Sequence, residues 1–453
     1  MQGSKMGALS ATAAGTLYMV TLGTLYTWGN IQLYILSYMR EVEGLESVRQ
    51  KDAAFGFAAL FTGQALFMPL GGIIERRYGP QASALLGGMV MSFGVWVTQY
   101  CLWSFPLMIF TYGLINGAGI GLGYTAPLVT SLKWLPEYKG AISGIISAGF
   151  GAGALFFNQV QTRYINPENL PADTPHPSSP SELYFSDPGI LSRVPNTFPI
   201  LATCYLLTQI VTVYMMKQPP QAPLGETKRE RVASYNTLSP PTHEPPAPVT
   251  DVPPQEAAKT AEFWLLWVMF FLNGLGIAFT ATFWKILGSG HSDGTLSLIG
   301  SVASMFNALG RVFWGGLADT ASFRFSLMTM TAVWVFAMAT FTFMAKLNVH
   351  IYAFWCCLNF FTLGGNFSLF PAATALKFGR LYLGTTYGFI YLSQMAGSIG
   401  CAFLAKALLG ALGTTGVTYL IASCLSVTLI LAASLPLFGV EFVEKGAAAV
   451  KKT

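Results

Sequence analysis

Charged residues are scarce in this chain. Asp, Glu, Lys and Arg make up only 10% of its 453 residues, whereas a soluble globular domain carries about 25%. Hydrophobic residues make up 53%. The formal net charge is only +5, and the apolar part of the chain has no basic run that could follow a phosphate backbone. This composition excludes a soluble enzyme, a disordered chain and a nucleic-acid-binding protein.

Residues that hold metals or carry out catalysis are also few. The four histidines fall in or beside the expected loops, and the six cysteines lie in apolar segments without metal-ligand spacing to a histidine. Such cysteines behave as small hydrophobic residues rather than as a disulfide framework. No Ser-His-Asp set is visible, and the glycines from Gly117 to Gly123 follow no strand and precede no Gly-Lys-Ser/Thr. We therefore expect no enzyme, no catalytic residue, no metal and no cofactor.

Long apolar runs dominate what is present. A membrane-spanning helix needs about 20 mostly apolar residues, and strands of a membrane barrel would instead alternate over about 10 residues. The sequence predicts an all-α membrane protein with twelve spanning helices, surrounded by a lipid bilayer. The predicted spans are 11–38, 53–75, 81–103, 106–131, 140–162, 197–217, 262–288, 295–318, 325–346, 349–371, 384–406 and 415–439.

The Lys and Arg residues of the loops predict the orientation. With both termini in the cytoplasm, about 16 of them lie on the cytoplasmic side and about 7 on the other side. Only Lys285 and Arg311 remain within spans. Because cytoplasmic loops usually carry more Lys and Arg than the loops on the other side, we expect both termini to be cytoplasmic. The expected location is the plasma membrane, with an organelle membrane as the alternative.

A proline-rich segment divides the chain. The residues from 218 to 258 contain ten prolines and scattered charge, so they cannot form a packed core. We predict a six-helix bundle over 1–217, a flexible cytoplasmic linker over 218–260 and a second six-helix bundle over 261–453.

The two predicted bundles share residues at a fixed offset of 244 positions. The pairs are Gly72 with Gly316, Glu75 with Asp319, Pro127 with Pro371, Thr130 with Thr374, Lys133 with Lys377, Gly140 with Gly384 and Gly144 with Gly388. One offset in two separate regions indicates a duplicated six-helix unit. Parallel six-helix halves around a central site are the architecture of one large class of secondary transporters.

A loop motif resembles that of the major facilitator superfamily, which reads roughly G-x-x-x-D/E-R-x-G between spans 2 and 3. Here the stretch runs from Gly71 to Gly79 and includes Glu75 and Arg76. A second copy ends at Asp319 and then departs from the pattern. The resemblance implies the fold of this superfamily, a functional monomer, and a gating role for Glu75, Arg76, Gly79 and Asp319.

A narrower resemblance is to the oxalate/formate antiporter-like and monocarboxylate transporter branch. It covers most of the chain except the linker and a loop over 163–196. The stretches that carry it are Gly23–Trp28, Gly119–Pro127, Lys133–Pro136, Lys139–Gly140, Phe306–Arg311, Phe370–Ala372, Phe378–Gly379 and Tyr387–Gly388. The resemblance implies transport of small organic anions by alternating access, with a proton or a counter-anion as coupling partner.

Arg311 is the most informative residue. It precedes Asp319 by eight residues, which places it about 12 Å from the helix end and deep in the bilayer. A charge there is costly unless it faces a polar cavity. A guanidinium binds a carboxylate through two parallel hydrogen bonds, so an anion site is one interpretation. A structural pair with a buried acid or with carbonyl groups is the other. In the resembled family, the arginine at this position binds the substrate carboxylate.

Two amides accompany this arginine. Asn307 lies four residues before Arg311 and shares its helix face. The resembled proton-coupled monocarboxylate transporters have an aspartate there, so Asn307 argues against proton symport by that route. The oxalate/formate antiporters have a lysine at the position of Gln394. A neutral amide there argues for a monocarboxylate rather than for oxalate. Asn307 could alternatively bond a neighbouring helix.

Lys285 is a candidate second cation. It lies 23 residues beyond Glu262, or roughly 35 Å along the helix, where lysines extend to the interface and leave their charge in water. This interpretation predicts an exposed ammonium group. A break in the helix near Gly274 or Gly276 would instead let Lys285 reach the site.

Four aromatic residues are further candidates. Tyr26, Trp28, Tyr124 and Tyr391 lie at family-matching positions in predicted spans 1, 4 and 11, and a tyrosine hydroxyl can orient a carboxylate. Most aromatic side chains of such a protein face lipid or packing seams. Five polar residues within spans either line the transport path or bond neighbouring helices, namely Asn30, Gln32, Gln64, Asn158 and Gln159.

The sequence therefore predicts a secondary transporter for a small organic anion, a monocarboxylate such as pyruvate or lactate. Arg311 would bind the carboxylate, with Gln394 and tyrosines around it. The alternatives are a transporter of another solute (a dicarboxylate, sugar, amino acid or drug) and a non-transporting membrane receptor on the same fold.

Overall fold

The computed structural model describes residues 2–134, 139–177, 179–218, 251–379 and 382–435. The first half contains α1 (Gln2–Leu22), η1 (Gly23–Thr27), α2 (Trp28–Glu41), η2 (Gln50–Ala53), α3 (Ala54–Tyr78), α4 (Pro80–Val97), η3 (Thr98–Tyr100), α5 (Phe105–Met108), η4 (Ile109–Ile115), α6 (Asn116–Gly123), α7 (Thr125–Trp134), α8 (Lys139–Gly151), α9 (Gly153–Ile165), β1 (Thr174–His176), β2 (Ser179–Tyr184) and α10 (Pro188–Met215). The second contains α12 (Pro254–Ala257), α13 (Ala261–Leu287), α14 (Asp293–Thr320), α15 (Phe323–Met344), α16 (Val349–Phe378) and α17 (Leu383–Ser434).

The described helices agree with the predicted spans. Among the described residues, ten helical segments are long and apolar enough to cross a membrane. The predicted span 140–162 is divided at Ala152 into α8 and α9. The last two predicted spans lie along α17, whose 52 residues would measure roughly 78 Å, far more than one crossing needs. Its backbone leaves helical geometry at Gly413, where φ is 64°, so α17 crosses twice.

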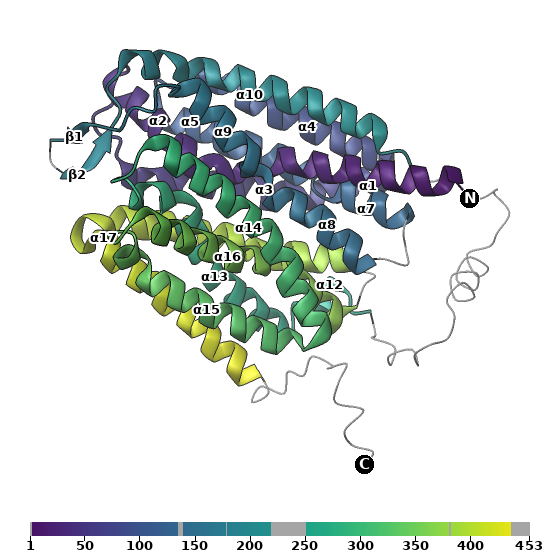
Figure 1. Ribbon diagram of the computed structural model, residues 1–453. Helices are drawn as coiled ribbons and strands as arrows, with labels where there is room; N and C mark the ends of the chain where they lie inside the picture. The colour runs from purple at the N-terminus through teal and green to yellow at the C-terminus, as the bar shows by residue number, and fades with distance from the viewer. Residues whose placement is uncertain (1, 135–138, 178, 219–250, 380–381, 436–453) are drawn as a thin grey trace, which may run out of the picture.

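The two halves lie side by side as helical bundles. In Figure 1 the first half, purple to teal, lies above the second half, green to yellow. The strands β1 and β2 lie at one end, here called the hairpin end, and α1 begins at the opposite, terminal end. The second part of α17 runs back from the hairpin end towards the terminal side. Residues 219–250, most of the predicted linker, lie outside the described residues.

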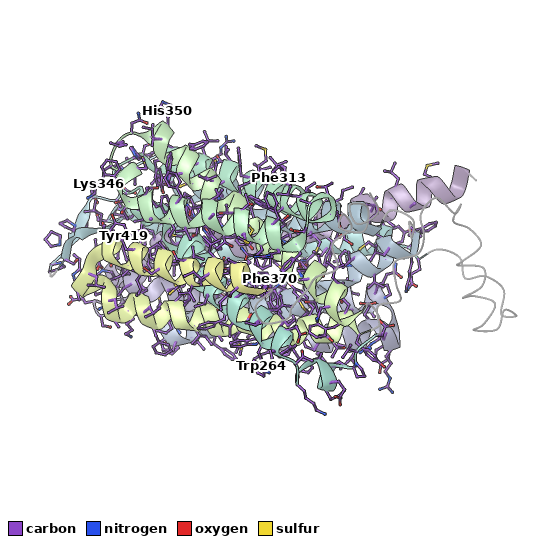
Figure 2. All side chains as sticks on the ribbon, turned by 90° about the horizontal axis from the view of Figure 1, so that it is seen from below. Trp264, Phe313, Lys346, His350, Phe370 and Tyr419 are labelled. Carbon is purple, nitrogen blue, oxygen red and sulfur yellow. The ribbon has the colours of Figure 1, made fainter. Side chains whose placement is uncertain are left out.

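Large apolar side chains cover the sides of the bundle. Trp264, Phe313 and Tyr419 are each more than half exposed, and Figure 2 shows Trp264 and Phe313 along the length of the bundle and Tyr419 towards the end where Lys346 and His350 lie. An exposed apolar surface of this extent is stabilised by lipid rather than by water. Together with the spanning helices, it makes this chain a multi-pass integral membrane protein.

Glycines bring the first and fifth spans into backbone contact. A Cβ atom added to Gly153 would overlap the backbone of Gly23, and one added to Gly23 would overlap the carbonyl group of Phe150. Only residues without a side chain allow the η1 segment to cross the α8–α9 break so closely. This crossing places Tyr26 and Phe150 next to each other, with ring centroids 5.9 Å apart.

A β-hairpin stands where the sequence analysis expected a loop. Its strands are antiparallel, with Thr174 opposite Tyr184. Arg49 binds Glu182 of the hairpin with a separation of 2.5 Å. Burial raises the pKa of Glu182, but hydrogen bonds from Arg49 and Tyr184 lower it more, so the pKa lies below its ordinary value. Glu182 therefore stays ionised and holds the hairpin against the helices.

The glycine crossing leads to a test of the fold. Gly153→Ala should lower the thermal unfolding midpoint of the purified protein and its monodisperse yield, because the backbones of η1 and α9 must move apart. Gly144→Ala is the matched control, since a Cβ atom at Gly144 meets nothing within 4 Å. Equal unfolding midpoints for the two variants would contradict the crossing.

Candidate functional site

Arg311 lies where the two halves meet. It belongs to α14, nine residues before the helix ends at Thr320, and its exposed fraction is 1%. Its hydrogen-bond partners come from both halves: Tyr26 and Ser147 from the first, and Asn307 from the second. A cation in this position is shared by two bundles that, in a protein of repeated halves, can move relative to each other.

All three hydrogen-bond partners of Arg311 are neutral. Its Nε donates to Asn307 Oδ1 at 3.3 Å, and its two terminal nitrogens donate to Ser147 Oγ at 3.0 Å and Tyr26 Oη at 3.2 Å. No carboxylate among the described residues forms an ion pair with it. A buried charge without a countercharge is costly, so this arrangement is suited to receive an anion.

Aromatic rings enclose the guanidinium. Its Cζ lies 4.6 Å from the centroid of the Phe367 ring and 5.3 Å from that of Phe150. Such contacts partly compensate a desolvated cation. Tyr124 packs edge-on against Phe150, with ring centroids 5.4 Å apart. The ring centroids of Tyr391 and Phe367 are 6.4 Å apart. The site therefore has one charged group, a few neutral polar groups and apolar walls.

Helical spacing explains how these side chains converge. Asn307 and Arg311 are four residues apart on α14, and Ser147 and Phe150 are three apart on α8, so each pair faces one way. Gly151 brings the two helices together, because a Cβ atom there would lie 2.9 Å from the Cα of Ala308 and 3.1 Å from the Nε of Arg311. Any larger residue at this position would displace the guanidinium.

The structure brings some of the predicted residues together. Arg311, Asn307 and Tyr26 are in direct contact. Tyr124 packs against Phe150, and Tyr391 packs against Phe367. The Asn307 Nδ2 is buried and has no hydrogen-bond partner within the described part of the chain, so it is a free donor beside the guanidinium. Because an unsatisfied buried donor is costly, a ligand oxygen would suit it.

The hydrogen bonds of Trp28 and Gln394 are made to residues other than Arg311. The Trp28 indole donates to the Ala53 carbonyl group at 2.9 Å and packs on Tyr112, which places it in the core of the first half. The Gln394 amide donates to the Phe270 carbonyl group and lies next to Gly274, within the second half. Both contacts support a structural role rather than direct contact with Arg311.

The expectation that Lys285 extends to the interface is wrong. Lys285 is only 2% exposed and pairs with Asp293 at 2.7 Å. The helix break proposed near Gly274 or Gly276 is also absent, since α13 runs unbroken from Ala261 to Leu287. Asp293 precedes Arg311 by 18 residues on α14, or roughly 27 Å. Lys285 is therefore not a second cation at the Arg311 site.

The predicted gating residues lie at the terminal end. Glu75 is half-buried, whereas Arg76 and Asp319 are exposed, and neither of the latter two takes part in an ion pair among the described residues. Gly79 ends α3 with φ at 92°, a conformation that favours glycine. This explains the glycine of the motif, and the gating role stays a prediction.

Sequence reasoning missed three residues of the site. Ser147 and Phe150 could have been found, because they lie at i and i+3 beside a glycine in a span that also carries Gly149 and Gly153. Phe367 is one of 34 phenylalanines, and no local pattern distinguishes it. Its place over Arg311 depends on how α16 packs against α14.

Comparisons with known proteins agree with this architecture. The family model for the Major Facilitator Superfamily matches residues 197–452. The chain is 37% identical to the apicoplast pyruvate carrier 1 of Toxoplasma gondii, with 91% of this chain and 86% of that protein covered. It is 25% identical to the oxalate:formate antiporter of Oxalobacter formigenes, with 74% of this chain and 71% of that protein covered. The crystal structure of a D-xylose–proton symporter has the same fold, with a TM-score of 0.63 and 13% sequence identity. The match covers 95% of this chain and 97% of that chain.

Two aromatic substitutions test the assignment of roles. Tyr26→Phe removes a hydrogen bond to a charged group, so it should weaken binding of pyruvate, used as a probe carboxylate, by about fivefold or more. Trp28→Phe removes only the bond to Ala53 and should lower the unfolding midpoint while leaving pyruvate affinity unchanged. Calorimetric titration and thermal unfolding of purified variants measure both. The reverse pattern would place Trp28, not Tyr26, at the site.

Proposed function

Because the chain belongs to the Major Facilitator Superfamily, a family of transporters and not of enzymes, we propose that it carries a small organic anion across its membrane by alternating access. The proposed substrate is a monocarboxylate such as pyruvate or lactate. The relatives named as a pyruvate carrier and an oxalate:formate antiporter support this substrate class.

The observation that carries the proposal is the neutral surrounding of Arg311. Arg311 is 1% exposed, and among the described residues its guanidinium is bonded to Asn307, Ser147 and Tyr26 alone. A carboxylate would supply the missing countercharge and accept two parallel hydrogen bonds from the planar fork. A guanidinium has five N–H groups, of which three donate to Asn307, Ser147 and Tyr26 among the described residues, so one N–H on each terminal nitrogen remains for the carboxylate.

The charge of the site favours a monocarboxylate. A second carboxylate would need a second cation, but the position that is lysine in the resembled antiporters is Gln394 here, and Lys285 is neutralised by Asp293. One unpaired cation and neutral amides suit one negative charge. The rings of Phe150 and Phe367 beside the guanidinium suit a short apolar body.

The site also suits alternating access around a central position. Tyr26 and Ser147 belong to the first half, and Asn307 and Arg311 to the second. An anion on Arg311 would therefore contact both bundles and be released when they rock apart. Asn307 cannot take up a proton, so exchange with a counter-anion or facilitated diffusion fits this site better than proton symport through that residue.

Orientation and location complete the proposal. The Lys and Arg distribution supports cytoplasmic termini, and a monomer suffices because the site is built within one chain. The plasma membrane remains the expected location. The organelle in the name of the T. gondii relative supports the alternative, and microscopy of the tagged full chain distinguishes the two.

The proposal predicts the effect of removing the cation. Arg311→Ala should abolish uptake of labelled pyruvate and lactate into proteoliposomes, because the carboxylate loses its countercharge in a desolvated site. Arg311→Lys should retain a small fraction of the rate, since lysine keeps the charge but not the planar fork.

Arg163→Ala is the matched control, because it removes an exposed arginine and should leave uptake at the wild-type rate. Insertion and monodispersity of each variant are checked first. Oxalate, a sugar and an amino acid in the same assay distinguish the alternative substrates. Undiminished pyruvate uptake by Arg311→Ala would overturn the proposal, and ligand binding without any flux would favour a receptor.

A further inference from the structure

The turn that follows α9 reaches across to the second half at the hairpin end. Residues 166–170 belong to the first half, whereas Asp293 and Gly294 begin α14 of the second half. The Asn166 amide donates to Asp293 Oδ2 at 2.9 Å, and Asn169 Oδ1 accepts a hydrogen bond from the backbone N–H of Gly294. The turn therefore holds the first residues of a helix that belongs to the other bundle.

The turn has a fixed shape that presents these two side chains. Asn166 Oδ1 accepts from the Leu170 N–H at 2.9 Å, and Asn166 Nδ2 donates to the Leu170 carbonyl group at 2.8 Å, so one side chain spans the turn. Asn169 has a φ of 57°, a left-handed conformation that asparagine adopts more readily than most residues other than glycine. A turn that is already ordered loses little conformational entropy when it binds the helix.

The start of α14 is shaped to receive this turn. The first N–H groups of a helix have no partner within it, and a side-chain oxygen usually caps one of them. Ser292, the residue just before α14, makes no such bond among the described residues, so the cap comes from Asn169 of the other half. A Cβ atom added to Gly294 would lie 2.9 Å from Asn169 Oδ1, so this close approach depends on a glycine.

A buried ion pair adds to the same contact. Asp293 is 4% exposed and pairs with Lys285 of α13 at 2.7 Å. Tyr34 and Asn166 of the first half both donate to Asp293 Oδ2, and Lys285 donates to Asn30 Oδ1 at 2.8 Å. A buried ion pair is tolerated where further hydrogen bonds satisfy it. Here the first half provides them, so separation of the halves must replace each of them with water.

The helix that is capped in this way also carries Arg311. It is continuous from Asp293 onwards, and the 18 residues between Asp293 and Arg311 correspond to roughly 27 Å. Between these two levels, Gln159 of the first half donates to Ser297 and Ser301 of α14 at 3.1 Å. The first half thus contacts α14 at its start, at Arg311 and in between.

We propose that the turn over residues 166–170 is a latch, which holds the hairpin end closed by capping α14 of the other half. While the latch is engaged, the first half covers α14 on the hairpin side of Arg311. When the halves separate, Asn169 leaves the Gly294 N–H and water takes its place, as at other exposed helix ends. The inference rests on the proposed function only in that the two halves move, and it requires no particular substrate.

Two substitutions release the latch from opposite sides. Gly294→Ala places a Cβ atom against Asn169, and Asn169→Gly allows the same backbone conformation but removes the capping oxygen. Alanine favours a helix more than glycine does, so Gly294→Ala does not weaken α14 itself. Because both substitutions remove the same cap, each should increase the open-to-closed ratio by about fivefold. The double variant should exceed neither single variant, since the two effects are not independent.

The open fraction is measured through a cysteine introduced at Ser301, which is 2% exposed and contacts the first half. The full chain, with its six native cysteines replaced, is placed in nanodiscs without substrate. A charged thiol reagent reaches this cysteine when the halves separate, and at low reagent concentration the rate is proportional to the open fraction. A small open fraction is therefore sufficient, and both release variants should react about fivefold faster than the parent.

Spin labels on Val42 and Leu347 identify the end that opens. These residues are 53% and 51% exposed and follow α2 of the first half and α15 of the second. Gly294→Ala should increase the population with a longer distance between the two labels. Tyr34→Phe removes a donor to Asp293 and should act in the same direction.

Gly290→Ala is the matched control, because a Cβ atom at Gly290 meets nothing within 4 Å. It should react with the thiol reagent at the parent rate. Trp28→Phe, which loses a bond in the core of the first half, should do the same and so separates release of the latch from general loosening.

Parent rates for both release variants would overturn the proposal, as would an equal acceleration by either control. Should one release variant not fold, the other one and Tyr34→Phe decide in the same way. Because no carboxylate is present, a negative result here leaves the proposed substrate untouched, and a failure of the Arg311 prediction leaves the latch untouched.

Discussion

The fold depends on how a bundle of apolar helices accommodates a cation at its centre. In a chain with 10% charged residues, Arg311 is buried without a carboxylate partner among the residues that the structure describes. Hydrogen bonds from neutral groups and the faces of two phenylalanine rings compensate part of the desolvation cost. In the proposed function, the remaining deficit is what favours binding of an anion at Arg311.

Two buried basic residues illustrate opposite solutions to this problem. Lys285 carries its own countercharge in Asp293, and the pair is covered by neutral groups of the other bundle. Within the part of the chain that the structure describes, the hydrogen-bond partners of Arg311 are all neutral. The first arrangement joins the two halves near the hairpin end, whereas the second is the one that we propose binds a ligand. Both lie between the two halves, so a rocking motion would change their surroundings at the same time.

Much of the architecture could be predicted from the sequence, because long apolar runs and their offset of 244 residues are properties of the chain alone. The pairing of Asn307 with Arg311 was also predictable, since it follows from helical spacing. The burial of Lys285 could not be predicted, because its ion-pair partner Asp293 lies across a turn at the start of the next helix. Phe367 and the hairpin depend on packing between distant segments, which no local pattern encodes.

The central claim is that Arg311 recognises a negatively charged carboxylate. The most direct measurement is displacement of labelled pyruvate from the purified protein by unlabelled pyruvate and by its methyl ester, which has a similar shape but no charge. We expect pyruvate to displace the label and the ester to fail at the same concentrations, because only the anion supplies a countercharge to the guanidinium. Equal displacement by both compounds would contradict the account.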